Sequence, residues 1–379
     1  MNVLNDSVDD TVQKKVAFFL PTLNIGGIER VFITYANYLI DKKYNIYFIL
    51  CKRRGELLSL LDSNIKLYHL GNVQLKFSFL KLRQSLKEIQ PDVIVSGGDF
   101  PNLILIVSSL GLKKVPKIII SQHNYYNVET RRLGWWAYGT CFFMKKIYPK
   151  ADKIIAVSDG IREFLIKKIH ISADRIIKLP NPIDIKGIKE KSLELLDITL
   201  PDRYILFVGR LSYVKNLFFL LDAFEMGKLD NNSLVIVGDG EMRNALMKKA
   251  KKMHKADNII FLGAMENPLP ILKKAQLLVL PSFSEAYPTI LLEALCLYIP
   301  VVSTPTKGAK EILHNVSGTY ISTDCYNIEE FARLMERGVK ERISHKVIDD
   351  KNKSMKFVVV KPYVNFKNID DVTIVEPRN

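Results

Sequence analysis

The stretch that decides the fold is Leu277-Leu278-Val279-Leu280-Pro281-Ser282-Phe283-Ser284-Glu285-Ala286-Tyr287-Pro288-Thr289-Ile290-Leu291-Leu292-Glu293-Ala294. Its continuous apolar start predicts a buried strand, which ends at Pro281. Pro288 stands where a helix can begin, and helix formers follow from Thr289, a candidate N-cap. Glu285 is therefore expected in a loop beyond the carboxyl end of a strand, and Glu293 about one turn into the next helix. Open α/β sheets bind their ligands at this edge.

Two carboxylates at this spacing are weak evidence alone, because solvated glutamates are common on helices. The residues around them, Ser-Phe-Ser-Glu-Ala-Tyr-Pro and Ala-Leu-Cys-Leu-Tyr-Ile-Pro-Val-Val-Ser, strengthen the signal. Together they resemble the E-x7-E motif of retaining glycosyltransferases of family 4, which have the GT-B architecture. The resemblance implies that Glu293 holds the ribose hydroxyls of a nucleotide sugar. It also implies that the donor sugar is oriented by Glu285 and by the backbone of Ala286, Tyr287, Pro288 and Thr289.

Length and composition set broader limits. A chain of 379 residues with 48% hydrophobic residues suits two folded domains. The net charge of +15 predicts an anionic partner, and charge alone allows nucleic acid, anionic lipid or a phosphorylated substrate. The four cysteines have no metal-binding spacing, so we expect reduced thiols in a cytoplasmic protein. The polar N-terminus does not resemble a signal peptide, and no apolar run is long enough to span a bilayer.

The first half alternates strands and helices, which predicts a parallel sheet covered on both faces. After the first strand, Gly26 and Gly27 precede a helix, where backbone can approach a phosphate or sugar; a tight structural turn is the alternative. The string Gly-Gly-Ile-Glu-Arg resembles the family loop that faces the donor phosphates and acceptor. His123 follows the strand expected at 117–121. A lone histidine is more often structural, but this one resembles the histidine of the family's Ser-x-His segment, near the donor sugar.

The second half repeats the alternation. Arg210 and Lys215 bracket a loop after the strand expected at 204–208, and this loop resembles the family's diphosphate clamp. Two cations there would stabilise charge on a departing nucleotide. No Asp-x-Asp motif is present, so we expect metal-independent chemistry and no cofactor. The turn at Gly238 is expected close to the nucleotide, although structure alone could explain its glycine, and the backbone at Met265 is the candidate contact for the base.

Basic and aromatic residues are mixed through 131–153, a composition typical of an anionic membrane interface. A core helix with a solvated basic flank is the alternative. No recognised nucleic-acid module accompanies it. The family resemblance favours peripheral attachment of a cytoplasmic protein to the inner membrane face.

The predicted organisation is a polar tail (1–15), an acceptor-side Rossmann-like domain (16–185), a nucleotide-sugar domain (186–337) and an atypical tail (338–379), with the two domains facing across a cleft. The predicted function is transfer, with retention, of a hexose from a UDP-sugar to a hydroxyl of a lipid-linked or surface-glycan acceptor. GDP-mannose is the second candidate donor. A GT-B epimerase or hydrolase and an inactive nucleotide-sugar-binding protein remain alternatives. The tail lacks the family's closing helix, which puts domain closure and full activity in question.

Overall fold

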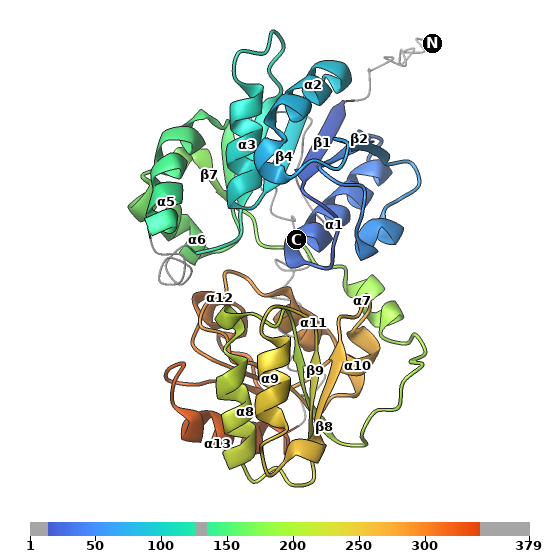
Figure 1. The fold of residues 1–379 in the computed structure, drawn as a ribbon, viewed down its shortest axis with the longest axis vertical. Helices are drawn as coiled ribbons and strands as arrows, with labels where there is room; N and C mark the ends of the chain where they lie inside the picture. The colour runs from blue at the N-terminus through green and yellow to red at the C-terminus, as the bar shows by residue number, and fades with distance from the viewer. Residues whose placement is uncertain (1–13, 126–134, 342–379) are drawn as a thin grey trace, which may run out of the picture.

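The computed structural model describes residues 14–125 and 135–341, which form two α/β domains stacked along the long axis (Figure 1). Each domain is built on a parallel sheet. The first has seven strands in the order β3-β2-β1-β4-β5-β6-β7, and the second has six in the order β10-β9-β8-β11-β12-β13. In both, the strand order reverses beside the first strand, which is the doubly wound topology predicted from the sequence.

The strands of the first domain are β1 (Lys15–Leu20), β2 (Asn45–Leu50), β3 (Lys66–His69), β4 (Val93–Gly97), β5 (Lys117–Gln122), β6 (Lys153–Ala156) and β7 (Ile176–Lys178). Its helices are α1 (Gly27–Asp41), α2 (Phe79–Ile89), α3 (Asp99–Ser109), α5 (Trp135–Ile147) and α6 (Asp159–Phe164). A short 3-10 turn, η2 (Leu75–Phe77), precedes α2.

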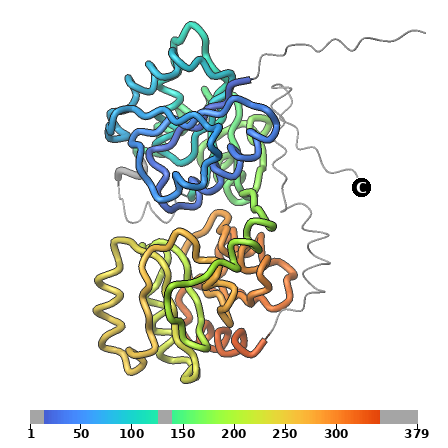
Figure 2. The backbone as a smooth tube through the Cα atoms, turned by 90° about the vertical axis from the view of Figure 1, so that its right-hand side faces the viewer, coloured from blue at the N-terminus to red at the C-terminus, as the bar shows by residue number. Residues whose placement is uncertain are grey.

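The strands of the second domain are β8 (Tyr204–Val208), β9 (Ser233–Val237), β10 (Ile259–Gly263), β11 (Leu277–Leu280), β12 (Val301–Ser303) and β13 (Thr319–Ile321). Its helices are α7 (Ile185–Lys191), α8 (Leu217–Met226), α9 (Arg243–Ala250), α10 (Leu269–Lys274), α11 (Thr289–Cys296), α12 (Lys307–Leu313) and α13 (Ile328–Gly338). The chain crosses between the domains just before α7, which packs against α10 and α11 (Figure 2).

Strand β1 shows how the first sheet is buried on both faces. Phe18 packs with Phe32 of α1 and Phe48 of β2 on one face, at ring-centroid distances of 5.4 and 5.3 Å. Its neighbours Ala17 and Phe19 belong to the core on the other face. Alternate residues of a strand point to opposite faces, so a strand covered on both sides must be apolar throughout. Each fully buried side chain of this size contributes about 1.5–3 kcal/mol.

The carboxyl-terminal edges of the two sheets meet at the interdomain junction. From the first domain, Arg30 of α1 donates to the Glu266 carbonyl beyond β10. Beyond β6, the Asp159 N–H donates to the Glu311 carboxylate at 3.1 Å. Lys307 at the start of α12 pairs with Glu163 of α6 at 2.8 Å. Loops that follow the strands of both sheets therefore face one another here.

Several expectations need correction. Thr289 is the first residue of α11 and not its N-cap; Pro288 holds the cap position with extended backbone and no side-chain bond. Helix α2 begins at Phe79, because η2 occupies the preceding turn. Helices α3 and α10 were not predicted. The atypical tail beyond residue 341 and the polar tail up to residue 13 lie outside the described residues.

Candidate active site

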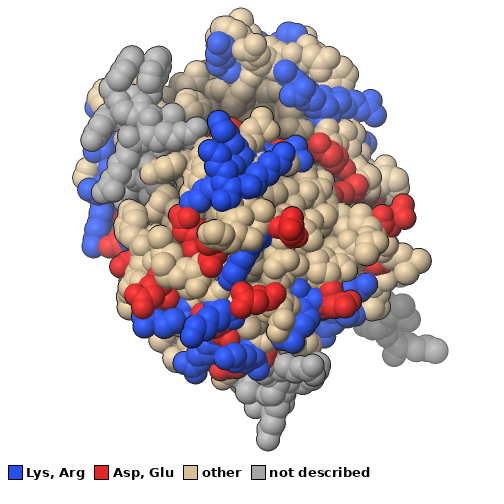
Figure 3. Space-filling model, turned by 60° about the horizontal axis from the view of Figure 1, so that its bottom comes forward, with Lys and Arg blue, Asp and Glu red and all other residues tan. Residues whose placement is uncertain are grey.

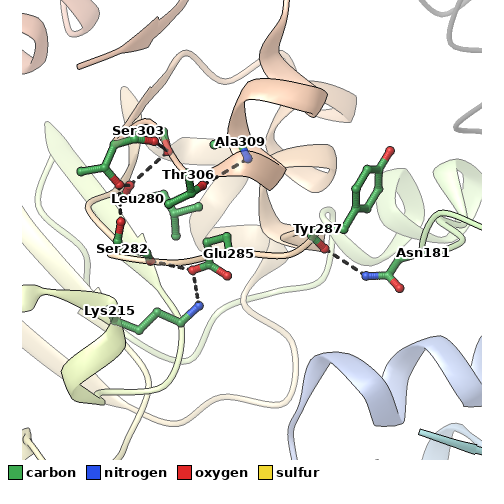
Figure 4. A network of polar contacts seen from close by, with 10 residues as sticks. Asn181, Lys215, Leu280, Ser282, Glu285, Tyr287, Ser303, Thr306 and Ala309 are labelled. Carbon is green, nitrogen blue, oxygen red and sulfur yellow. Dashed lines mark hydrogen bonds and ion pairs between the residues drawn. The ribbon is translucent and has the colours of Figure 1, made fainter. Parts of the chain in front are cut away.

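The centre of the candidate site is an ion pair between two loops of the second domain. Lys215, in the loop after β8, lies 2.6 Å from an Oε1 of Glu285, in the loop after β11. The side chains remain 22% and 11% exposed, so both are accessible to a ligand at some cost of desolvation. Figure 4 shows Lys215 and Ser282 pointing at the same carboxylate from different sides. The sequence placed both charged groups beyond strand ends, and the structure brings them into contact.

The Glu285 loop is held from below by backbone and hydroxyl contacts. Ser282 Oγ donates to Glu285 Oε1 at 2.6 Å, and the carbonyl of Ser282 accepts from Thr304 Oγ1 at 2.5 Å. The Gly308 N–H of α12 donates to the Glu285 carbonyl at 3.0 Å. A Cβ on Gly308 would lie 2.5 Å from the Ala286 carbonyl oxygen, so only glycine allows α12 this close. The loop is therefore fixed in place before any ligand arrives.

Arg210 lies on the same loop as Lys215 but has a different environment. Its side chain is 75% exposed, and Nη2 lies 3.3 Å from Oε2 of Glu241. The structure therefore does not place Arg210 against Glu285. An exposed ion pair of this kind contributes little, typically below about 1 kcal/mol, so the guanidinium is readily released to another anion.

Glu293 lies in the second turn of α11 and is only partly exposed. Burial raises the pKa of its carboxyl, and the nearby positive charge of Arg30 opposes that rise. Arg30 belongs to α1 of the other domain, so the guanidinium reaches across the junction. The local sequence around Arg30 predicts no site role for it, because no local pattern indicates a partner more than 200 residues away.

Gly238 and Met265 mark the ends of neighbouring strands. Gly238 has φ +140°, and its N–H donates to the Gly263 carbonyl at 2.7 Å. A Cβ on Gly238 would collide with the Gly209 carbonyl, so close packing of the loops after β8, β9 and β10 explains the glycine on structural grounds. Met265 lies in the loop after β10 and packs, partly buried, against the core. Both residues therefore lie at the junction edge, where a ligand contact remains a prediction.

In the first domain, the junction edge of the sheet carries Gly26, Gly27 and His123. Gly26 is the extended N-cap of α1, and a Cβ there would collide with the Glu29 carboxylate; Gly27 has open space around its Cα. His123 follows β5 and is only 8% exposed. Its Nε2 lies 2.8 Å from Ser121 Oγ, and burial lowers the pKa of the imidazole to about 4. At neutral pH the ring is uncharged.

A buried polar network lies beneath His123. Gln122 Nε2 donates to Asp99 Oδ1 at 2.6 Å, and its Oε1 accepts from Tyr148 at 3.0 Å. Asn102 Nδ2 donates to the Ser121 carbonyl at 3.0 Å. Satisfied networks of this kind rigidify the structure around them. The end of β5 is therefore preorganised, and the His123 ring beside it is uncharged at neutral pH.

The segment between the domains is tied directly to the Glu285 loop. Asn181, in Pro180-Asn181-Pro182, donates through Nδ2 to the Tyr287 carbonyl at 2.9 Å (Figure 4). The segment immediately precedes the predicted domain boundary at 185/186. Movement of the segment between the domains would therefore shift the backbone at Tyr287, two residues from Glu285.

Within residues 14–125 and 135–341, no group of three or more His, Cys, Asp or Glu side chains could hold a metal ion. In the same part of the chain, no helix has the length and apolarity needed to cross a membrane.

Comparison with known proteins gives the family. The model for Glycosyltransferase Family 4 matches residues 25–186, and the model for Glycosyl transferases group 1 matches residues 189–355. A Campylobacter jejuni protein named GalNAc-alpha-(1->4)-GalNAc-alpha-(1->3)-diNAcBac-PP-undecaprenol alpha-1,4-N-acetyl-D-galactosaminyltransferase is 30% identical over 357 residues, covering 86% of this chain and 93% of its own. This chain belongs to glycosyltransferase family 4.

Two further comparisons agree with that assignment. The UDP-Gal:alpha-D-GlcNAc-diphosphoundecaprenol alpha-1,3-galactosyltransferase of Escherichia coli is 23% identical over 378 residues and covers 92% of each chain. The crystal structure of Anabaena HepE in complex with UDP and glucose superposes with a TM-score of 0.72 at 16% identity, covering 91% of this chain and 95% of that one. The predicted GT-B fold is confirmed, and this family 4 protein is a glycosyltransferase of the hexosyltransferase type.

Proposed function

We propose that this family 4 glycosyltransferase transfers a hexose, with retention of configuration and without a metal ion, from a UDP-sugar to a hydroxyl of an undecaprenyl-diphosphate-linked glycan. The Lys215–Glu285 pair carries the proposal, because it sets a cation and a carboxylate side by side at the junction edge of the second domain. The relatives support the substrate classes: two are named for undecaprenyl-linked acceptors, one of them with a UDP-linked donor.

The donor would lie mainly on the second domain. Glu293 would accept the ribose hydroxyls, and Lys215 would leave Glu285 in part to bind the diphosphate. Arg210, held only by an exposed pair with Glu241, would turn to the same phosphates. The N–H groups at the start of α11 add partial positive charge. Glu285 and the backbone of 286–289 would then orient the sugar.

Transfer would need no protein nucleophile. The bond between the anomeric carbon and the diphosphate oxygen breaks, the acceptor hydroxyl bonds to the same face of the anomeric carbon, and the leaving phosphate takes the hydroxyl proton. Lys215 and Arg210 stabilise the negative charge that develops on the phosphate. The neutral His123 ring and the glycine loop at Gly26 and Gly27 would position the acceptor, so that catalysis rests on orientation and charge stabilisation.

The membrane and cellular location belong to the same proposal. The segment 131–153 was expected to contact an anionic membrane; its first residues lie outside the described part, and its described end carries exposed Phe142, Phe143, Lys145 and Lys146. These residues support peripheral attachment of a cytoplasmic enzyme to the inner membrane face, where a polyprenyl-linked acceptor would be presented.

A donor screen followed by a transfer assay tests the proposal. UDP-GalNAc, UDP-GlcNAc, UDP-galactose, UDP-glucose and GDP-mannose are compared by thermal shift; a donor at a hundredfold its Kd stabilises the fold by about 2.7 kcal/mol. The stabilising donor is then incubated with a GalNAc-terminated undecaprenyl diphosphate, with and without EDTA, and the product anomer is determined by NMR. We expect an α-linked product both with and without EDTA. Sugar release or epimerisation without acceptor would favour a hydrolase or epimerase, and binding without turnover an inactive binding protein.

A further inference from the structure

Three aromatic side chains form a row in the loops at the carboxyl-terminal edge of the second sheet. The ring of Phe283 lies between two tyrosine rings, with its centre 5.4 Å from that of Tyr213 and 5.7 Å from that of Tyr326. Tyr213 is 51% exposed, Tyr326 is 71% exposed, and Phe283 is half-buried. This aromatic row is therefore a set of packed rings that keep much of their surface in solvent.

The three rings come from three different loops, and contacts between the loops fix them to one another. The Phe283 N–H donates to the Val214 carbonyl at 2.8 Å. Asn216 donates through Nδ2 to the Cys325 carbonyl at 3.0 Å, and the Cys325 thiol lies 3.8 Å from the Ser282 carbonyl. The backbone beneath the aromatic row is therefore held in place before any ligand binds.

The stability of the loops does not explain why the tyrosines are exposed. Aromatic rings stabilise a fold mainly by removing apolar area from water, and Tyr213 and Tyr326 leave half or more of their surface in water. The turn at Tyr326 has its own support, because the Asp324 carboxylate accepts from the N–H groups of Tyr326 and Asn327 at 2.6 and 2.7 Å. A contiguous group of exposed rings is typical of a ligand-binding surface.

The far end of the same domain has a different surface. Figure 3 views the molecule from the end formed by the second domain, where Lys and Arg side chains are interspersed with Asp and Glu. Interspersed charges of both signs are the ordinary surface of a soluble protein and indicate no ligand. The aromatic row therefore differs in kind from the solvated end of its own domain.

The order of the strands places the aromatic row beyond the sugar end of the proposed donor site. The second sheet runs β10-β9-β8-β11-β12-β13. Met265, the proposed contact of the base, follows β10; Lys215 follows β8 and Glu285 follows β11. Tyr326 follows β13, at the opposite end of this order from Met265. Along the sheet, base, diphosphate and donor sugar are thus followed by the aromatic row, on the side where an acceptor would continue.

We propose that Tyr213, Phe283 and Tyr326 form a subsite for a neutral sugar of the acceptor glycan, one or two residues away from the sugar that receives the hexose. The C–H groups on one face of a pyranose carry partial positive charge, and the face of an aromatic ring is negative, so the two surfaces attract. Stacking also removes apolar area of both partners from water. The identity of the glycan as the acceptor rests on the proposed function, whereas binding of a sugar by the rings does not.

The length of the acceptor tests the subsite. Short-chain, water-soluble diphosphate acceptors that carry either one or three sugars, each ending in GalNAc, are compared with the wild type and the double variant Tyr213→Ala, Tyr326→Ala. For the three-sugar acceptor, we expect the KM of the variant to rise about tenfold with kcat within about twofold, because the lost contact binds substrate and transition state equally. The KM for the one-sugar acceptor should change by less than about twofold, since that acceptor does not reach the aromatic row.

Two further variants separate stacking from other effects of substitution. Tyr213→Phe with Tyr326→Phe keeps both rings, so the KM for the three-sugar acceptor should stay close to that of the wild type. Phe77→Ala with Phe79→Ala removes two exposed rings from the first domain and should leave both KM values unchanged. Because both tyrosines are exposed, thermal unfolding of the double alanine variant should resemble that of the wild type, which shows that it is folded.

Saturation-transfer NMR gives a measurement that needs no catalysis. Irradiation of the protein's aromatic protons should saturate the C–H protons of the free three-sugar glycan with wild type, and this transfer should be lost in the double alanine variant. No transfer with wild type, or equal transfer and equal KM in both proteins, would overturn the subsite. Self-association of the wild type that the double alanine variant lacks would also overturn it. Sugar binding without turnover on any acceptor would instead count against the proposed function.

Discussion

The junction edges of the two sheets carry polar side chains in different states. At the second sheet, Lys215 and Glu285 pair with each other while both keep some contact with solvent. At the first sheet, Gln122 and His123 are buried and bonded to Asp99 and Ser121 within their own domain. The second edge can therefore exchange an internal partner for a charged ligand, whereas the first cannot do so without leaving buried polar groups unpaired. This difference supports the proposal that the second domain stabilises charge and the first positions the acceptor.

Removal of Lys215 is the strongest test of that division and has the largest expected effect. Lys215→Ala should slow transfer by roughly a hundredfold or more, because loss of a preorganised cation at the leaving group costs about 2.7–4 kcal/mol. The transfer rate of Arg210→Ala, a substitution on the same loop, is expected to fall by a similar factor. Steady-state turnover at saturating donor measures both.

The control for Lys215 is Lys249→Ala, since Lys249 is also partly exposed and paired with an acid in the same domain. It should leave turnover within twofold of wild type. Near-normal turnover in both Lys215→Ala and Arg210→Ala would show that these residues do not hold the leaving group.

The buried state of His123 predicts a pH dependence of stability. Burial lowers the folded-state pKa to about 4, whereas an unfolded imidazole titrates near 6.5. The unfolded chain therefore binds a proton that the folded chain does not, so stability is fully present above about pH 6.5 and falls as pH drops toward 4. The loss should reach about 3 kcal/mol at the lower end.

Chemical denaturation between pH 7.5 and pH 4 measures this loss. His123→Gln should show a shallower decline than wild type, and His254→Gln, at an exposed position, is the matched control. Carboxylates also titrate in this range, so the difference between the slopes is the readout. Identical slopes for wild type and His123→Gln would mean that His123 is not held neutral by the first sheet's edge.

The same comparison explains what the sequence could and could not predict. The strand at 204–208 was predicted with its exact bounds, and the run that starts at Leu277 was correctly predicted to end before Pro281, because buried parallel strands are short apolar runs. Helix α3 was missed, since residues such as Leu105 and Ile106 are apolar around most of its circumference and hide the helical period. The candidate site was found through local motifs around Lys215 and Glu285.

Contacts between distant segments were beyond sequence reasoning. The pairing of Lys215 with Glu285 spans 70 residues, and no spacing rule predicts it. The contact of Arg30 with the Glu266 carbonyl spans 236 residues and crosses between the domains. The network under His123 likewise joins residues from β5, α3 and the turn after α5, each of which has an ordinary local sequence.

Gly308→Ala tests whether the second edge depends on close backbone packing. The new Cβ would lie 2.5 Å from the Ala286 carbonyl and 2.8 Å from that of Glu285, and backbone cannot yield as a side-chain tip can. We expect a loss of about 1–3 kcal/mol in the free energy of unfolding, together with weaker donor binding. Thermal unfolding and donor titration measure the two effects.

Gly160→Ala, across the junction, is the matched comparison. Its Cβ would meet the Tyr125 hydroxyl and the Lys307 side chain, both of which can move. Its cost should be smaller than that of Gly308→Ala and should leave donor binding unchanged. If Gly160→Ala proved the more damaging of the two substitutions, close backbone packing would not be what fixes the Glu285 loop.

Substitution of Arg30 has the smallest expected effect and the sharpest readout, because the positive charge of Arg30 opposes the rise in the pKa of Glu293 from the other domain. Arg30→Ala removes a bond to the Glu266 carbonyl and a positive charge near the carboxyl. The donor KM should rise about fivefold, or about 1 kcal/mol, with kcat within twofold. Since Arg30 opposes the rise in the pKa of Glu293, its removal should raise that pKa further and move the acid limb of the kcat/KM profile to higher pH.

The control is Ser59→Ala, which removes the hydrogen bond from Ser59 Oγ to the Glu266 carboxylate, 2.9 Å long, and should leave the acid limb in place. A rise in KM with an unmoved limb would mean that Arg30 only ties the two domains together. A moved limb would show that the first domain tunes the charge of Glu293, the carboxylate proposed to bind the ribose.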